Sequence, residues 1–145
     1  MIEKDTVKLL RECDAGIKMG VDSIAEVLGR TRAPGMRKAL TDCRAQHEQL
    51  KQEVLQELAR FQDEGKDPNP VAEKMSWLKT EAMLMMKEND DAAIADLMTD
   101  GCNMGVKSLN RYLNQYKAAD ERSKDITKRL IHLEQTLAED MRSYL

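Results

Sequence analysis

Aromatic residues are scarce in this sequence. One phenylalanine, one tryptophan and three tyrosines stand among 145 residues. So few rings argue against a nucleic-acid interface built on base stacking, and the formal net charge of −3 provides no basic surface for phosphates. We therefore expect no nucleic-acid partner. We also expect a core of aliphatic side chains, to which the ten methionines contribute.

Long apolar runs are absent as well. No stretch approaches the roughly 18 consecutive apolar residues that a membrane-spanning helix needs, and residues 1–5 lack the basic and apolar regions of a signal peptide. Cys13, Cys43 and Cys102 never form a C-x-x-C pair, which is typical of reduced thiols packed as small hydrophobic side chains. We expect a cytoplasmic protein with no membrane partner.

What the sequence does contain is the apolar periodicity of helices, nearly from end to end. Apolar residues recur three and four positions apart, which places them on one face of a helix. No alternation of apolar and polar residues over a strand length stands out. The clearest interruption combines glycine, proline and aspartate at residues 63–70. The pattern predicts helices over residues 4–29, 34–62, 71–88, 91–117 and from the turn at 118–120 to the C-terminus.

These helices predict one domain, residues 1–145, of the all-α class. Short loops make the two helices of each hairpin antiparallel, in the hairpins 4–62 and 91–145. The connection at 63–90 is long enough for its own helix to carry the chain along most of the bundle. We expect a four-helix bundle of two duplicated hairpins joined by a long crossover, which is the ferritin-like arrangement.

Two copies of one glycine motif support the duplication. The first copy is Gly16-x-x-Met19-Gly20-Val21-x-Ser23-Ile24. It recurs 85 residues later as Gly101-x-x-Met104-Gly105-Val106-x-Ser108-Leu109. Glycine inside a helix costs about 0.8–1 kcal/mol relative to alanine, so something must offset each pair. Both glycines of a pair lie on one helix face. We predict that the first and third helices of the bundle cross there with their backbones close together. The alternative is a ligand pocket, which would need polar groups that converge on the same place.

Several segments resemble a known family. They are Cys13-Asp14-Ala15-Gly16, Phe61-Gln62-Asp63-Glu64-Gly65-Lys66-Asp67-Pro68, Trp77-Leu78-Lys79, Asn89-Asp90-Asp91-Ala92-Ala93-Ile94 and the tyrosine-bearing helix at 91–117. On these segments the chain resembles the ferritin-like superfamily. More narrowly, it is similar to an uncharacterised bacterial group of small ferritin-like proteins described as a domain of unknown function. The resemblance covers nearly the whole chain and implies a ferritin-like bundle in a bacterial protein.

This resemblance directs attention to metal ligands. The di-metal sites of ferritin-like proteins take a carboxylate from each of two helices and Glu-x-x-His from each of the other two. Here arginines stand where those glutamates belong, since Arg44 precedes His47 and Arg129 precedes His132 by three positions. Guanidinium groups at these places would repel the metals. We predict that His47, which lies in an apolar stripe, is buried and hydrogen-bonded, and that His132 is exposed.

The remaining candidate ligands are Glu12 and Asp96, which we expect at solvated or capping positions. We therefore predict no catalytic, cofactor-binding or metal-binding residues, and a non-enzymatic binding or scaffolding protein. The alternative is an atypical iron- or manganese-binding oxidoreductase or storage protein that uses His47 or His132.

The helix predicted at 71–88 is the expected contact surface. Its large apolar residues cover more than one face, whereas a crossover helix lying on a bundle buries a single stripe. Trp77 and Leu84 would then lie on an exposed apolar patch, and such patches commonly mark interaction sites. We expect a homodimer or a protein partner to dock there. The opposing interpretation is a connecting helix buried on both sides within its own bundle.

Overall fold

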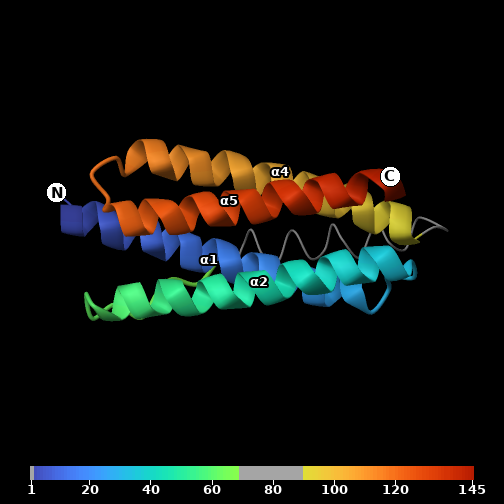
Figure 1. Ribbon diagram of the computed structural model, residues 1–145, viewed down its shortest axis with the longest axis horizontal. Helices are drawn as coiled ribbons and strands as arrows, with labels where there is room; N and C mark the ends of the chain where they lie inside the picture. The colour runs from blue at the N-terminus through green and yellow to red at the C-terminus, as the bar shows by residue number, and fades with distance from the viewer. Residues whose placement is uncertain (1, 69–89) are drawn as a thin grey trace.

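The computed structural model describes residues 2–68 and 90–145, and over this part of the chain it contains α-helices and no strand. The helices are α1 (Ile2–Leu28), α2 (Pro34–Ala59), α4 (Asp90–Gln115) and α5 (Glu121–Met141), followed by a short 3-10 helix η1 (Arg142–Tyr144) (Figure 1). The prediction of an all-α bundle is therefore confirmed for these residues. The helix predicted at 71–88, with Trp77 and Leu84, lies outside the described residues. None of the described helices is long and apolar enough to cross a membrane.

The helices form two antiparallel hairpins, α1 with α2 and α4 with α5, and α2 and α4 run in the same direction (Figure 1). The end of α2 lies beside the start of α5, where Arg122 pairs with Glu57. The start of α4 lies at the opposite end of the bundle, where the Asp91 carboxylate accepts hydrogen bonds from the backbone N–H groups of Arg32 and Ala33 at 2.7 and 2.9 Å. The chain thus leaves α2 at one end of the bundle and enters α4 at the other.

Local sequence signals account for several helix boundaries. Pro34 occupies the first turn of α2, where its missing N–H and fixed φ are tolerated. The Asp120 side chain caps α5 by accepting a hydrogen bond from the Ser123 N–H at 2.8 Å. At the other end of α2, Gln62 has a φ of 57°, so the helix ends at Ala59 rather than at the predicted residue 62.

Two clusters of buried aliphatic side chains form the core. Among the described residues no aromatic side chain is buried, whereas Cys13, Cys43 and Cys102 all are, as the composition predicted. Both α1 and α5 contact all three of the other helices, so these two approach each other across the bundle. One cluster contains Ile24, Val27, Met36, Leu40, Ile94, Met98, Leu137 and Met141, and the other contains Leu10, Ile17, Leu50, Val54, Leu109, Ile126 and Leu130.

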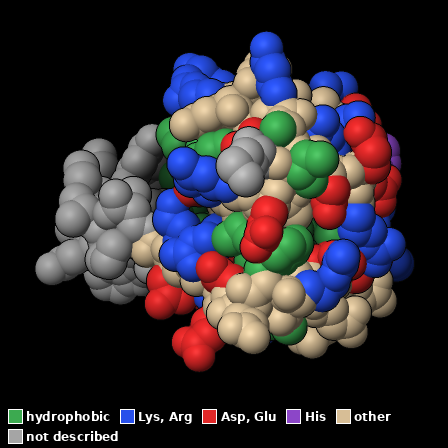
Figure 2. All heavy atoms as spheres, turned by 90° about the vertical axis from the view of Figure 1, so that its left-hand side faces the viewer, with side chains coloured by type: hydrophobic (Ala, Val, Ile, Leu, Met, Phe, Trp, Pro, Cys, Tyr) green, Lys and Arg blue, Asp and Glu red, His purple; other side chains and the backbone are tan. Residues whose placement is uncertain are grey.

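Charges of both signs are mixed on the end of the bundle that carries the start of α1 and the turn between α4 and α5. In Figure 2, which faces this end, Lys and Arg side chains alternate with Asp and Glu around smaller apolar areas. No patch of a single sign covers the described side chains in this view. The small net charge of −3 is therefore accompanied, at this end of the bundle, by a mixture of positive and negative side chains.

Candidate functional site

A layer of four residues, one from each helix, separates the two apolar clusters in the middle of the bundle. Along every helix the buried residues of one cluster come before this layer and those of the other come after it. The four residues are Gly20 of α1, His47 of α2, Gly105 of α4 and Glu134 of α5, and we call them the polar layer. It is the place in the described core where a histidine and a carboxylate meet.

The two glycines leave the space that the two polar side chains occupy. A Cβ atom placed on Gly20 would lie 3.1 Å from His47 Nε2 and 3.8 Å from Glu134 Oε1. One placed on Gly105 would lie 3.4 Å from Glu134 Oε2. Gly20 of α1 and Gly105 of α4 thus flank an imidazole and a carboxylate rather than each other. Polar groups do converge on the glycine motif, but they are side chains of the protein itself and fill the space beside the two glycines.

The other glycine of each pair has a different environment. Apart from the neighbouring residues and backbone of the same helix, no described atom comes within 4 Å of a Cβ placed on Gly16 or on Gly101, and both residues are exposed. The prediction that α1 and α4 approach each other closely along both glycine pairs is therefore wrong. The two helices do contact each other, but the atoms nearest to Gly20 and Gly105 belong to side chains from α2 and α5.

His47 is bonded to protein groups through both ring nitrogens. It is 1 % exposed, its Nδ1 lies 2.8 Å from the backbone oxygen of Cys43, and its Nε2 lies 2.9 Å from Glu134 Oε1. A carbonyl oxygen can only accept, so Nδ1 carries a proton and donates it to this bond. A hydrogen bond between Nε2 and Glu134 then requires a second proton between them. The pair is either imidazolium with carboxylate or neutral imidazole with carboxylic acid. The prediction of a buried, hydrogen-bonded His47 is confirmed.

The surroundings of His47 favour its charged form. Burial lowers the pKa of this imidazole, but its hydrogen bonds to the side chains of Cys43 and Glu134 and the electrostatic effects of these two residues outweigh burial and raise the pKa to about 10. At neutral pH the pair is therefore imidazolium with carboxylate. Removing either partner of a buried ion pair leaves the other charge without compensation, which is strongly destabilising.

The three cysteines have three different neighbours. Cys13 Sγ lies 3.2 Å from Thr127 Oγ1, and burial raises the pKa of this thiol to about 12 despite that hydrogen bond. Burial also raises the pKa of Cys102, and the negative charge of Glu134 raises it further. Cys43 instead places its Sγ 3.5 Å from Nδ1 of His47. Burial thus favours the protonated form of Cys13 and Cys102, whereas Cys43 has the His47 ring as its neighbour.

The structure does not bring together the side chains that the sequence analysis considered as candidate metal ligands. His132 is exposed, as predicted, and so is Arg44. Arg129 points to the surface, where its guanidinium donates two hydrogen bonds of 2.8 Å to Glu53. Within residues 2–68 and 90–145, no group of three or more His, Cys, Asp or Glu side chains is arranged to hold a metal ion. Asp96 lies partly exposed on α4.

Glu12 does not occupy the solvated or capping position that we predicted. It forms an ion pair with Lys66, in the turn that follows α2. Beside it the fully buried Asp14 accepts hydrogen bonds from the Lys66 backbone N–H and from the Lys18 ammonium group, both at 2.9 Å. Gly65 has a φ of 98° and passes so close to Asp14 that a Cβ would clash with the carboxylate. Both acidic residues of α1 therefore bind the segment 63–68 through Lys66.

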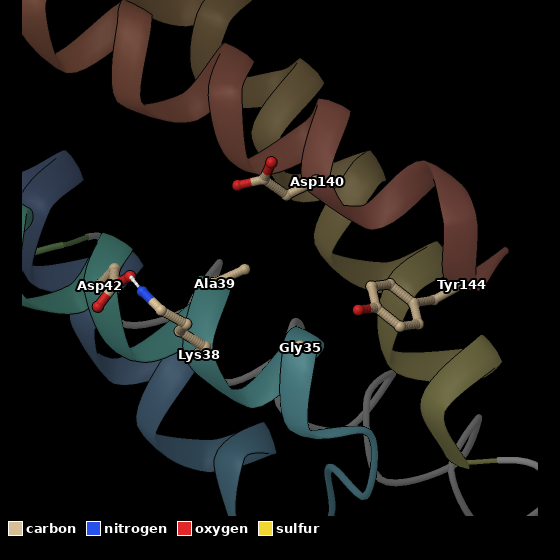
Figure 3. Close-up of a pocket in the computed structure, with 6 residues that line it drawn as sticks. All are labelled: Gly35, Lys38, Ala39, Asp42, Asp140 and Tyr144. Carbon is tan, nitrogen blue, oxygen red and sulfur yellow. Dashed lines mark hydrogen bonds and ion pairs between the residues drawn. The ribbon is translucent and has the colours of Figure 1, made fainter.

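A shallow groove of about 280 Å³ lies between the first turns of α2 and the end of the chain (Figure 3). Its α2 side carries Lys38, which pairs with Asp42 at 2.6 Å. The opposite side carries Asp140 of α5 and Tyr144 of η1 (Figure 3). Sequence reasoning missed this groove because its charged residues, Lys38, Asp42 and Asp140, follow the ordinary polar pattern of exposed helix faces. The remaining lining residues are Gly35 and Ala39.

Glu134 is the main site residue that the sequence analysis missed. A signal was available, because Glu134 is four residues after Leu130 and three before Leu137, both of which are buried. A charged residue at such a position in an apolar stripe indicates a buried polar contact. Comparisons with known proteins give no further guidance, since no family model, curated protein or solved structure matches this chain. The polar layer must be interpreted from its own geometry.

Proposed function

We propose that this protein is a non-enzymatic, ferritin-like helical bundle that lacks a complete di-metal site and serves as a binding or scaffolding protein in the bacterial cytoplasm. The polar layer is the observation that supports the lack of a complete di-metal site. Ferritin-like di-metal sites need inward-facing ligands from all four helices in the bundle core. At this level α1 and α4 have Gly20 and Gly105, which have no side chain to offer, and the histidine and the glutamate bind each other.

The path of the chain also supports the ferritin-like part of the proposal. A bundle of this kind joins two antiparallel hairpins through one long crossover. Such a crossover must leave the second helix at one end of the bundle and enter the next helix at the other. The start of α4 beside the turn between α1 and α2 meets that requirement.

The proposed partner surface is the segment 71–88, through which the chain would dock a second copy or another protein. This part of the proposal rests on the sequence pattern that leaves Trp77 and Leu84 outside a single apolar stripe. Replacing both with polar residues should give a folded, monomeric variant in size-exclusion chromatography with light scattering. An oligomer that is unchanged by the double substitution would remove this surface from the proposal.

Metal content tests the loss of the di-metal site. The full chain is produced in medium supplemented with iron and manganese, purified without chelators and analysed for its elements. We expect no stoichiometric transition metal, because both nitrogens of His47 are already bonded within the protein. Two metal ions per chain that disappear in His47→Ala, but persist in the matched surface variant His132→Ala, would refute the proposal and favour the atypical iron- or manganese-binding protein.

A further inference from the structure

Cys43 stands apart from the other two cysteines by its charge environment. All three thiols are buried, with exposed fractions of 0 % for Cys13, 6 % for Cys43 and 2 % for Cys102. A thiol becomes reactive as its thiolate, which neighbouring cations stabilise and which burial and neighbouring anions disfavour. Cys13 has a neutral hydroxyl as its partner, and Cys102 lies near the Glu134 carboxylate. Cys43 alone among the three has an imidazole nitrogen within 3.5 Å.

The chain holds this imidazole in a fixed orientation. Cys43 and His47 are four residues apart on α2, so their side chains lie on one face, one turn apart. The His47 Nδ1–H points toward the carbonyl oxygen and the sulfur of Cys43, at 2.8 and 3.5 Å. Glu134 binds the opposite nitrogen at 2.9 Å and balances the positive charge on the ring. The spatial order is thus a thiol, an imidazole and a carboxylate that orients the imidazole. This is the arrangement that activates cysteines as nucleophiles.

We propose that Cys43 is a peroxide-reactive thiol, oxidised by hydrogen peroxide to a sulfenic acid, with His47 as its charge partner and Glu134 as the residue that positions His47. In this step the Cys43 sulfur attacks one peroxide oxygen, an S–O bond forms and the O–O bond breaks. The departing hydroxide takes up the thiol proton and leaves as water. The sulfur loses two electrons and the peroxide gains them, so the products are one sulfenic acid and one water. This reactivity does not depend on the proposed scaffolding function.

Site-resolved labelling of the full, folded chain tests the assignment. The protein is exposed to hydrogen peroxide, the sulfenic acid is trapped with dimedone, and peptide mass spectrometry follows each cysteine separately. We expect Cys43 to be labelled about tenfold faster or more than Cys13 and Cys102, because it alone has a cationic neighbour. His47→Gln should lower the Cys43 rate to that of the other two thiols. The matched control His132→Gln, which changes an exposed histidine, should leave all three rates unchanged.

Loss of structure gives a different result from loss of the charge partner. A variant that opens the bundle raises labelling at all three cysteines, whereas the proposal requires a decrease at Cys43 alone. Glu134→Gln keeps a side chain of similar shape and provides a second test, which should also slow Cys43 selectively. Equal rates for the three wild-type thiols, or a Cys43 rate that neither His47→Gln nor Glu134→Gln lowers, would overturn the proposal.

Discussion

Replacement of Gly20 by alanine sets two effects of similar size against each other. Alanine within a helix is favoured over glycine by about 0.8–1 kcal/mol. The new Cβ, however, would lie 3.1 Å from His47 Nε2 and 3.2 Å from Cδ2, so the imidazole would have to move. His47 is 1 % exposed and bonded through both nitrogens, and forced shifts of this kind in a packed core cost about 1–3 kcal/mol. We expect Gly20→Ala to destabilise the protein by about 1 kcal/mol net.

The other glycines of the motif supply matched controls within the same two helices. Gly16→Ala and Gly101→Ala place a Cβ where no described atom lies within 4 Å, so both should stabilise the protein by about 0.4–1 kcal/mol. Gly105→Ala is intermediate. Its Cβ would be 3.4 Å from Glu134 Oε2, an ordinary contact with the end of a longer side chain, and most of the helix-propensity gain should remain.

Urea denaturation at constant pH measures the whole series, with the midpoint as the readout and the slope as the test that unfolding remains comparable. For a chain of this size, 1 kcal/mol corresponds to roughly 2–4 °C in the melting temperature, which gives an independent check. The decisive result is the sign of the change in stability, since Gly20→Ala should be less stable than the wild type and Gly16→Ala should be more stable. A Gly20→Ala variant as stable as Gly16→Ala would mean that His47 does not fill the space beside α1, and the polar layer as described would be refuted.

Two further predictions concern the ion pair and the turn after α2. The pKa of His47 is raised from 6.5 to about 10 in the folded protein, so its stabilising contribution is complete below pH 6.5 and is lost as the pH rises to about 10, with a slope of up to about 1.4 kcal/mol per pH unit. Urea denaturation at several pH values across this window should show that the unfolding free energy of the wild type falls as the pH rises, whereas that of His47→Gln should not show this fall. An identical pH dependence of the two unfolding free energies would contradict the ion pair. Gly65→Ala should cost about 2 kcal/mol or more, because it combines a positive φ with a clash against the Asp14 carboxylate. Gly29→Ala, whose Cβ meets no described atom within 4 Å, is the control, and equal melting temperatures for the two variants would show that the turn is not held against α1.

The helices themselves could be predicted from the sequence, because their signals are local. Apolar residues three and four apart define the buried face of each described helix, and Pro34 and Asp120 mark helix starts through chemistry within one turn. The burial of His47 followed from the same periodicity, since it lies between Cys43 and Leu50 in one apolar stripe. Glycine inside a helix is otherwise unfavourable, so the motif indicated a close neighbour at these positions. Gly20 and Gly105 have such a neighbour, and Gly16 and Gly101 do not.

The partners of these residues were decided by the tertiary structure. Glu134 meets His47 across 87 positions of sequence, and that contact depends on how far each helix is rotated and shifted along its neighbours. Rotation and shift result from the packing of both apolar clusters at once, so no local pattern contains them. The same reason explains why Glu12 was predicted in solvent, although Lys66 reaches it from the turn after α2. It also explains why the glycine motif was expected to join two backbones, when the helices are placed so that Gly20 and Gly105 enclose an imidazole and a carboxylate.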